Sequence, residues 1–168
     1  MVGPAGRGAG RTLTVQPSGD AFDPRLAAVL AGLRVEVDPR EFAVVRLAAV
    51  YGPSLRLALA SLLAPFFVDV GAREVRAVLA ADEWAKVAHR FPRAQVEDGY
   101  RLMVLEAPRD PAAPDYLAAV AAALTRAGVR AQVLPSFHHE HLLVPSALVE
   151  RAGMVLHALV DAARGAVS

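Results

Sequence analysis

The chain has 168 residues, of which 55% are hydrophobic and 21% charged, and it contains no cysteine. This size and apolar content predict one folded domain or two small halves that share a core, and exclude a disordered chain or a separate catalytic domain. The lack of cysteine excludes disulfides and thiolate sites, and a formal net charge of +1 provides no overall field that would attract nucleic acid or an anionic membrane. No apolar run is long enough to span a membrane, so we expect a soluble, cytoplasmic protein.

The N-terminal part is predicted to contain a tail, a helix and a strand. Residues 1–20 are rich in glycine and proline and are interpreted as a flexible tail. Asp23-Pro24 is typical of a helix start, and residues 21–37 are interpreted as this helix and a connection. Asp38-Pro39 is expected to break the chain before a β-prone run over 42–47.

The next segment is predicted to alternate helices and strands. The expected elements are a helix after Gly52-Pro53 that ends at Pro65, strands over 66–70 and 74–79 joined by a turn at Gly71, and a helix capped by Asp82. Residues 38–95 are therefore interpreted as the first structural half.

Residues 96–168 are interpreted as the second half, with the same order of elements. The expected elements are a strand over 100–105, a helix that begins near Pro114-Asp115 and ends at Gly128, strands over 129–133 and 141–144, and a last helix capped by Ser146. Both halves thus run strand, helix, strand, strand, helix. The pattern predicts an α+β fold of two ferredoxin-like βαββα units, with antiparallel sheets backed by helices on one face. We expect the other face of the sheet, or its edge, to be left for a partner.

Two adjacent segments carry a family resemblance. Residues 127–133 (AGVRAQV) and 137–144 (FHHEHLLV) resemble the bacterial tandem ACT-domain family, in which a Gly-Ile/Val-Ser-Ala-x-Val strand is followed by an aromatic pair, a His-Asp-His turn and an apolar strand. The chain differs in having His138 as the second aromatic position, Glu140 in place of the aspartate, and a proline-rich loop over 108–111. In broader view the chain is similar to aspartokinase regulatory domains and to cytosolic arginine sensors.

The resemblance implies a small-molecule sensor without catalytic activity or cofactor. ACT modules bind amino acids between paired domains, so a ligand would bind at a cleft between domains or subunits, and a homodimer is implied. The residues implied at this site are Ser136, Phe137, His139, Glu140 and His141, with Asp110 and Asp115 from the facing loop. Glu140 would bind the ammonium group of a zwitterion, and backbone N–H groups its carboxylate.

The histidine-rich segment also allows other interpretations. In an extended chain His139 and His141 would share one face and could bind a metal ion, with a further ligand from His89 or His157. Alternatively, this segment is an exposed turn or contact surface of a structural domain that binds no ligand. Ser136 beside three histidines is a poor nucleophile–base pair, because close neighbours on a strand point in different directions. RNA binding is disfavoured because the aromatic strand signature of an RNA-recognition motif is absent.

Overall fold

Six strands and five α-helices are formed by residues 23–136 and 139–167, which are the residues that the computed structural model describes. The helices are α1 (Pro24–Ala31), α2 (Gly52–Leu59), α3 (Ala81–Val87), α4 (Tyr116–Arg126) and α5 (Val149–Val167), with 3-10 turns η1 (Ala49–Tyr51), η2 (Ala88–Arg90) and η3 (Ser146–Leu148). The strands are β1 (Arg34–Ala48), β2 (Phe66–Val70), β3 (Glu74–Ala80), β4 (Gln95–Glu106), β5 (Gln132–Pro135) and β6 (Glu140–Pro145).

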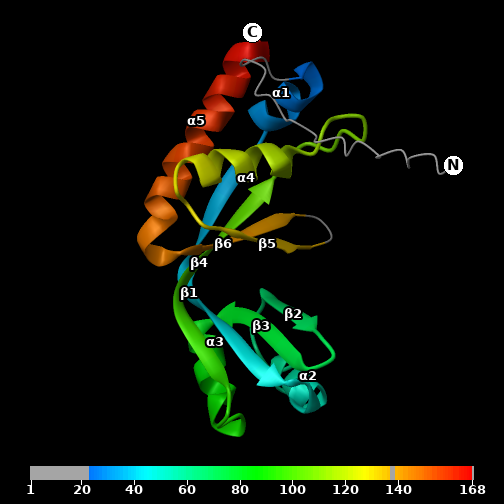
Figure 1. The fold of residues 1–168 in the computed structure, drawn as a ribbon, viewed down its shortest axis with the longest axis vertical. Coiled ribbons are helices and arrows are strands. Elements are labelled where there is room, and N and C mark those ends of the chain that lie inside the picture. The colour runs from blue at the N-terminus through cyan, green and yellow to red at the C-terminus, as the bar shows by residue number, and fades with distance from the viewer. Residues whose placement is uncertain (1–22, 137–138, 168) are drawn as a thin grey trace, which may run out of the picture.

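The strands form one antiparallel sheet in the order β2-β3-β1-β4-β6-β5. The two long central strands, β1 and β4, run through the whole molecule, whereas β3 pairs with one end of β1 and β6 with one end of β4 (Figure 1). This arrangement leaves β2 and β5 as the two edges of the sheet.

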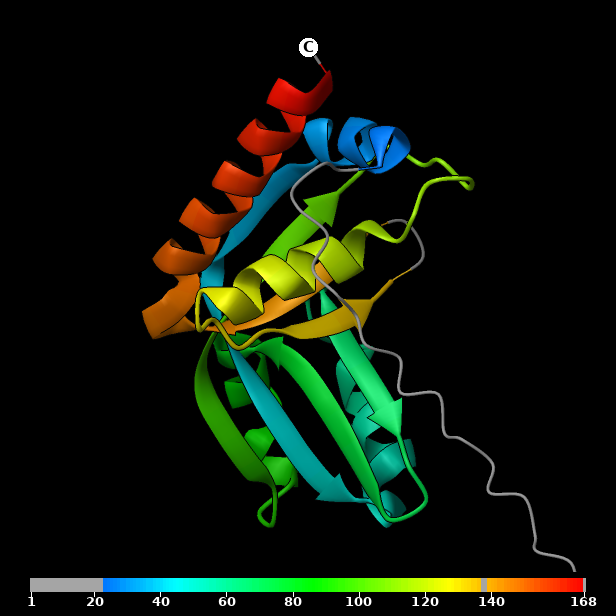
Figure 2. The same ribbon diagram turned by 45° about the horizontal axis from the view of Figure 1, so that its top comes forward.

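Helices cover the outer side of the sheet in two groups. At one end, α1, α4 and α5 pack on β4 and β6 around residues such as Leu105, Leu142 and Leu156. At the other end, α2 and α3 pack on β1 and β3 around residues such as Leu55 and Trp84. Figure 2 shows the first group gathered at one end of the molecule, away from α2 and α3.

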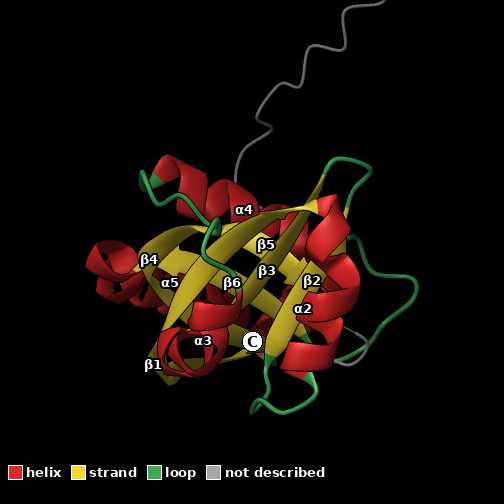
Figure 3. Ribbon diagram, turned by 90° about the horizontal axis from the view of Figure 1, so that it is seen from below, coloured by secondary structure: helices red, strands yellow, loops and turns green. Residues whose placement is uncertain are grey.

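The inner side of the sheet forms a third core, because the sheet curls and its two ends face each other (Figure 3). This core is formed by apolar residues of β1, β3, β4, β5 and β6, with one residue of edge strand β2 packed against it: Phe42, Val44, Val78, Ala80, Leu102, Leu134 and Leu143, with Phe67. Of the two expectations for a partner surface, the open second face is wrong, whereas the edges at β2 and β5 remain. Sheet twist buries that face within the same chain.

Several helix-end signals in the sequence are confirmed. The Asp23 carboxylate accepts hydrogen bonds from the backbone N–H groups of Arg25 and Leu26 at the start of α1. Asp115 accepts the N–H of Leu117 at the start of α4, and Gly128 follows the end of that helix at φ +71°. These devices act within one turn of chain, which is why sequence alone predicts them.

The expected chain break at Asp38-Pro39 is absent, because β1 is continuous across these residues. A register shift between Val37 and Glu41 places this segment in a bulge, where a proline without an N–H does not interrupt the ladder. The Asp38 carboxylate accepts hydrogen bonds from the backbone and guanidinium of Arg40, which hold the pKa of Asp38 below its usual value. Residues 34–37, expected as a connection, are therefore part of the sheet.

Other element boundaries also differ from expectation. Asp82 lies inside the first turn of α3 and does not cap it, since Ala80 is the N-cap residue. Ser146 begins the turn η3 instead of capping α5, and its hydroxyl is buried without a hydrogen-bond partner among the described residues. Helix α2 ends at Leu59, well before Pro65.

The helices and strands described above do not test two of the expectations, which are the flexible tail and the division of the chain into two halves. The predicted flexible tail over 1–20 lies outside the described residues. The division into halves at 38–95 and 96–168 stays a prediction. None of the helices within the described ranges combines the length and apolar character needed to cross a membrane.

Candidate functional site

A cavity of about 480 Å³ lies between the segment that joins β4 to α4 and residues Ser136, His139 and Glu140 of the β5–β6 hairpin. We call it the loop pocket. Its lining contains five of the seven sequence-predicted site residues: Asp110, Asp115, Ser136, His139 and Glu140. Its volume is in the range of small-molecule sites in proteins. Phe137, the sixth predicted residue, lies outside the described residues.

The loop wall of this pocket is held in place by contacts on both sides. A Cβ atom built on Gly32 would lie 2.5 Å from Cγ of Pro108, so the backbone after α1 and the loop pack too closely for any side chain. The Asp110 carboxylate accepts the N–H of Ala112 at 2.9 Å and forms an ion pair with Arg25 at 3.7 Å. Helix α1 therefore supports the loop and also contributes Val29 to the pocket lining.

The hairpin wall is formed by the residues on either side of the tip. The Ser136 hydroxyl donates a hydrogen bond to the carbonyl of His139, and the N–H of His139 is 3.4 Å from that hydroxyl. Nδ1 of His139 is 3.7 Å from the Glu106 carboxylate, so this ring also contacts the end of β4. Glu140, the first residue of β6, is half-buried and lines the pocket from below the loop.

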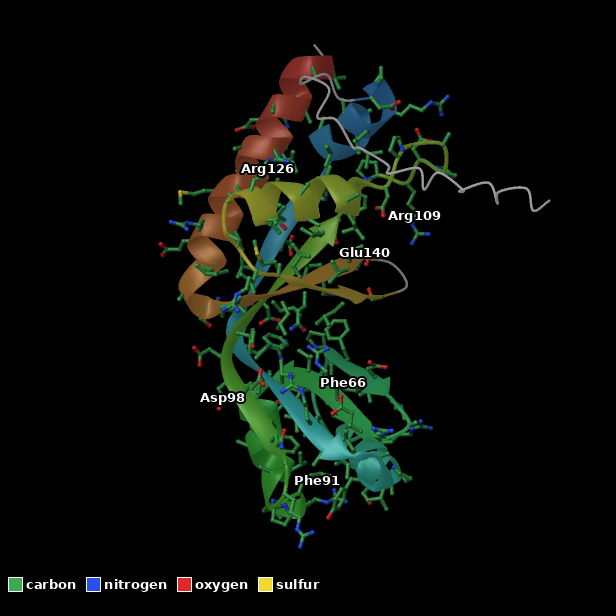
Figure 4. The ribbon with its side chains drawn as sticks, in the orientation of Figure 1. Phe66, Phe91, Asp98, Arg109, Arg126 and Glu140 are labelled. Atoms are coloured by element: carbon green, nitrogen blue, oxygen red, sulfur yellow. The ribbon has the colours of Figure 1, made fainter. Side chains whose placement is uncertain are left out.

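The charged residues of the loop pocket affect the ionisation of Tyr116, which lines the same cavity. Desolvation by burial, followed by the charges of Glu140 and Asp115, raises the pKa of Tyr116 to about 12. Tyr116 lines the pocket and stays a neutral phenol, able to donate or accept a hydrogen bond. Arg109 is the cation of the lining, and Figure 4 shows its side chain reaching from the loop toward the hairpin that carries Glu140.

His141, the seventh predicted residue, is not part of this pocket. It is only 9% exposed, and its ring packs edge-on against Phe67 of β2 with centroids 4.9 Å apart. Successive residues of a strand point to opposite faces, so His141 lies on the inner side of the sheet with Leu134 and Leu143. Its assignment to the ligand site is not supported by this geometry.

The positions of His139 and His141 also concern the alternative that these two histidines bind a metal ion. His139 lies beside Glu106, whereas His141 lies against Phe67. Within residues 23–136 and 139–167, no three histidine, aspartate or glutamate side chains are grouped closely enough to bind a metal ion.

The burial of His141 predicts a pH-dependent stability. Desolvation by burial, and then the charge of His139, lowers the pKa of His141 below its ordinary value of about 6.5. As the pH falls, the unfolded chain therefore binds the proton first. The stabilisation is complete above about pH 6.5 and is lost as the pH falls toward the lower pKa of the folded state.

We expect the free energy of unfolding, measured by urea denaturation, to be lower at about pH 5.5 than at about pH 7.5. His141→Leu, which fills the same apolar space, should reduce this difference, whereas the control His89→Gln, at an exposed histidine of η2, should keep it. An unchanged difference in His141→Leu would show that another group causes it.

Two residues of the loop pocket were not singled out from the sequence. Tyr116 carried no signal in the sequence, and Arg109 stood only as one member of the proline-rich loop over 108–111. A zwitterion needs a cation as well as a carboxylate in its site, so the arginine in the facing loop was a usable signal. Val29 gave no such signal in the sequence, because it reaches the pocket only through the packing of α1.

Sequence comparisons find no match to this chain, whereas structural comparisons find proteins of similar fold. No protein-family model matches the chain. No curated protein matches it either. A protein of unknown function from Vibrio cholerae, described as a possible transport protein, has a similar structure with a TM-score of 0.61 and 18% identity, over 80% of this chain and 95% of that chain.

Two further similar structures are regulatory subunits of aspartate kinase. The Thermus thermophilus subunit in its ligand-free form has a TM-score of 0.59 and 14% identity, over 76% of this chain and 98% of that one. The Thermus flavus subunit has a TM-score of 0.55 and 12% identity, over 83% and 99% of the two chains. At these identities the likeness concerns the fold. This chain therefore has the α+β, ACT-like architecture of aspartate kinase regulatory subunits, with one curled antiparallel sheet backed by helices.

Proposed function

We infer that this chain is a non-catalytic regulatory module whose loop pocket binds an amino acid or a similar small zwitterion. The observation that carries this inference is the convergence of Glu140, Arg109 and Tyr116 on one cavity of about 480 Å³. A carboxylate suits an ammonium group, a guanidinium suits a carboxylate, and charge-assisted hydrogen bonds to both would fix the orientation of the ligand. The likeness to regulatory subunits of aspartate kinase supports a regulatory role.

The proposal includes a mechanism by linkage. A ligand bound in the loop pocket contacts the loop after β4 and the β5–β6 hairpin together, and so stabilises the arrangement in which both walls are in place. A homodimer formed through the sheet edges would then sense this arrangement; β2 offers the exposed Val68 and Val70 for such a contact. We keep the cytoplasm as the expected compartment, since the chain contains no cysteine.

A thermal-shift screen of the common amino acids tests this proposal. A ligand that binds the folded chain at about 100 times its dissociation constant adds about 2.7 kcal/mol to the free energy of unfolding. For a chain of this length that corresponds to a rise in melting temperature of several degrees. We expect one amino acid, or a closely related group, to give such a rise, with zinc and nickel as controls for the metal alternative. A panel in which no amino acid raises the melting temperature contradicts the proposal.

A further inference from the structure

A second cavity lies where the curled sheet brings its two edges close together. The guanidinium of Arg76 on β3 donates a hydrogen bond to the amide oxygen of Gln132 on β5, and Phe67 of β2 contacts His141 of β6. Between these contacts is a cavity of about 580 Å³ that opens between β2 and β5. We call it the seam pocket. It is separate from the loop pocket except for Ser136, which lines both.

Most of the residues that line the seam pocket are apolar, and polar groups contribute a similar share of its surface. Phe66 and Phe67 line it from β2, Val78 from β3, and Val133 and Leu134 from β5. The aromatic side chains of β2 are half-buried, and Val133 is 43% exposed, so this surface is accessible from solvent. Such a lining favours a hydrocarbon or aromatic group of a ligand.

Arg76 adds a specific charge to this apolar lining. Its side chain is half-buried, and its hydrogen-bond partner, the Gln132 amide, is neutral. Among the described residues no carboxylate lies within 4.0 Å of its guanidinium. Asp69, the other charged residue of the lining, faces Arg76 across the β2–β3 pair but forms no ion pair with it. A partly desolvated guanidinium beside apolar surface is stabilised by an anion that it can bind in a bidentate manner.

We propose that the seam pocket binds an apolar carboxylate: a small acid with an aromatic or branched hydrocarbon body. The carboxylate contacts Arg76 and takes over the position of the Gln132 amide, while the body lies against Phe67, Val78 and Leu134. The ammonium group of an amino acid is not required here, which distinguishes this ligand class from the zwitterion proposed for the loop pocket.

Phenylpropionate is a suitable probe, and phenylpropanol is its uncharged analogue. We expect phenylpropionate to cause saturable shifts in amide NMR spectra of the whole chain at Phe67, Arg76 and Leu134, and phenylpropanol to bind at least about tenfold more weakly. Arg76→Gln should weaken phenylpropionate binding by about tenfold or more, since the charge is lost. Arg73→Gln removes the same charge from the exposed turn of the same hairpin, outside the pocket lining, and should leave the affinity within about twofold.

Several results would overturn the proposal. These are the absence of saturable shifts, equal binding of the acid and the alcohol by the unmodified chain, or an unchanged affinity in a folded Arg76→Gln. Shifts confined to Tyr116 and Glu140 would mean that the acid occupies the loop pocket. If extended apolar peptides bind along β2 or β5 and phenylpropionate causes no response, the ligand of the seam pocket is a peptide and the proposed small acid is wrong. Glu140→Gln should leave phenylpropionate binding unchanged, so failure here and failure of the amino-acid proposal can be distinguished.

Discussion

Replacement of Phe42 by alanine is expected to lower the free energy of unfolding by about 3–5 kcal/mol. Phe42 is fully buried in the inner core, on the central strand β1, where its backbone faces Ala80 of β3 and Tyr100 of β4. Removal of the ring would leave a cavity where the two ends of the curled sheet meet, and this rigid centre has little freedom to collapse into it. Such a loss is a large part of the roughly 5–15 kcal/mol that stabilises a typical domain.

Urea denaturation followed by far-UV circular dichroism measures this effect. The control Val37→Ala removes apolar atoms from the same strand at a residue that is 42% exposed, and should cost less than about 1 kcal/mol. Equal losses in the two variants would contradict a packed inner core and would indicate that the face remains open to solvent.

Glu140→Gln is expected to weaken binding of the amino acid in the loop pocket by about 10- to 100-fold. The carboxylate of Glu140 is the anion that we assign to the ammonium group, and after burial its charge is the next cause that raises the pKa of Tyr116 in the same cavity. The amide has nearly the same shape but no charge, so the change removes a charge-assisted hydrogen bond of about 1.5–3 kcal/mol. Isothermal titration calorimetry with the amino acid selected by thermal shift measures the affinities.

A thermodynamic cycle that combines Glu140→Gln with a modified ligand separates this contact from a general effect of charge. The N-acetylated form of the amino acid has no ammonium group, so it should bind the unmodified chain weakly, and Glu140→Gln should weaken it little further. Glu150→Gln at the exposed start of α5 is the matched control and should not change the affinity. If both forms of the amino acid lose the same factor in Glu140→Gln, Glu140 does not contact the ammonium group.

Local signals in the sequence predicted most elements of the fold. Asp23 and Asp115 cap helices with their own side chains, and Gly128 adopts the positive φ that follows a helix end. Each depends on hydrogen bonds within one turn, so no knowledge of distant residues is needed. The β2–β3 hairpin also lies where its β-prone runs and the turn at Gly71 indicate.

Features set by distant residues could not be predicted in this way. Pro39 is a reasonable chain break when read locally, but a bulge beside β4 accommodates it within β1. The curl that buries Phe42 and His141 on the inner face results from the twist of the whole sheet. The alternation of apolar residues indicates which faces are buried, but not whether a helix, the sheet itself or another chain covers them.

The candidate site shows the same limit. Glu140, His139 and Ser136 are close in sequence and were expected together, and Asp110 and Asp115 meet them because the loop after β4 faces the hairpin. His141 was expected with them because it matches the second histidine of the His-Asp-His turn in the ACT-domain resemblance. The structure has β6 beginning at Glu140, so the side chain of His141 points to the other face.

An amide NMR titration of the whole chain with the amino acid that gives the largest thermal shift tests the central claim most directly. The account predicts saturable shifts that cluster on Tyr116, His139 and Glu140, with little change at the outer faces of α2 and α3. Saturable shifts confined to residues away from the loop after β4 and the β5–β6 hairpin, or no shift at any amino-acid concentration, would contradict a zwitterion site in the loop pocket.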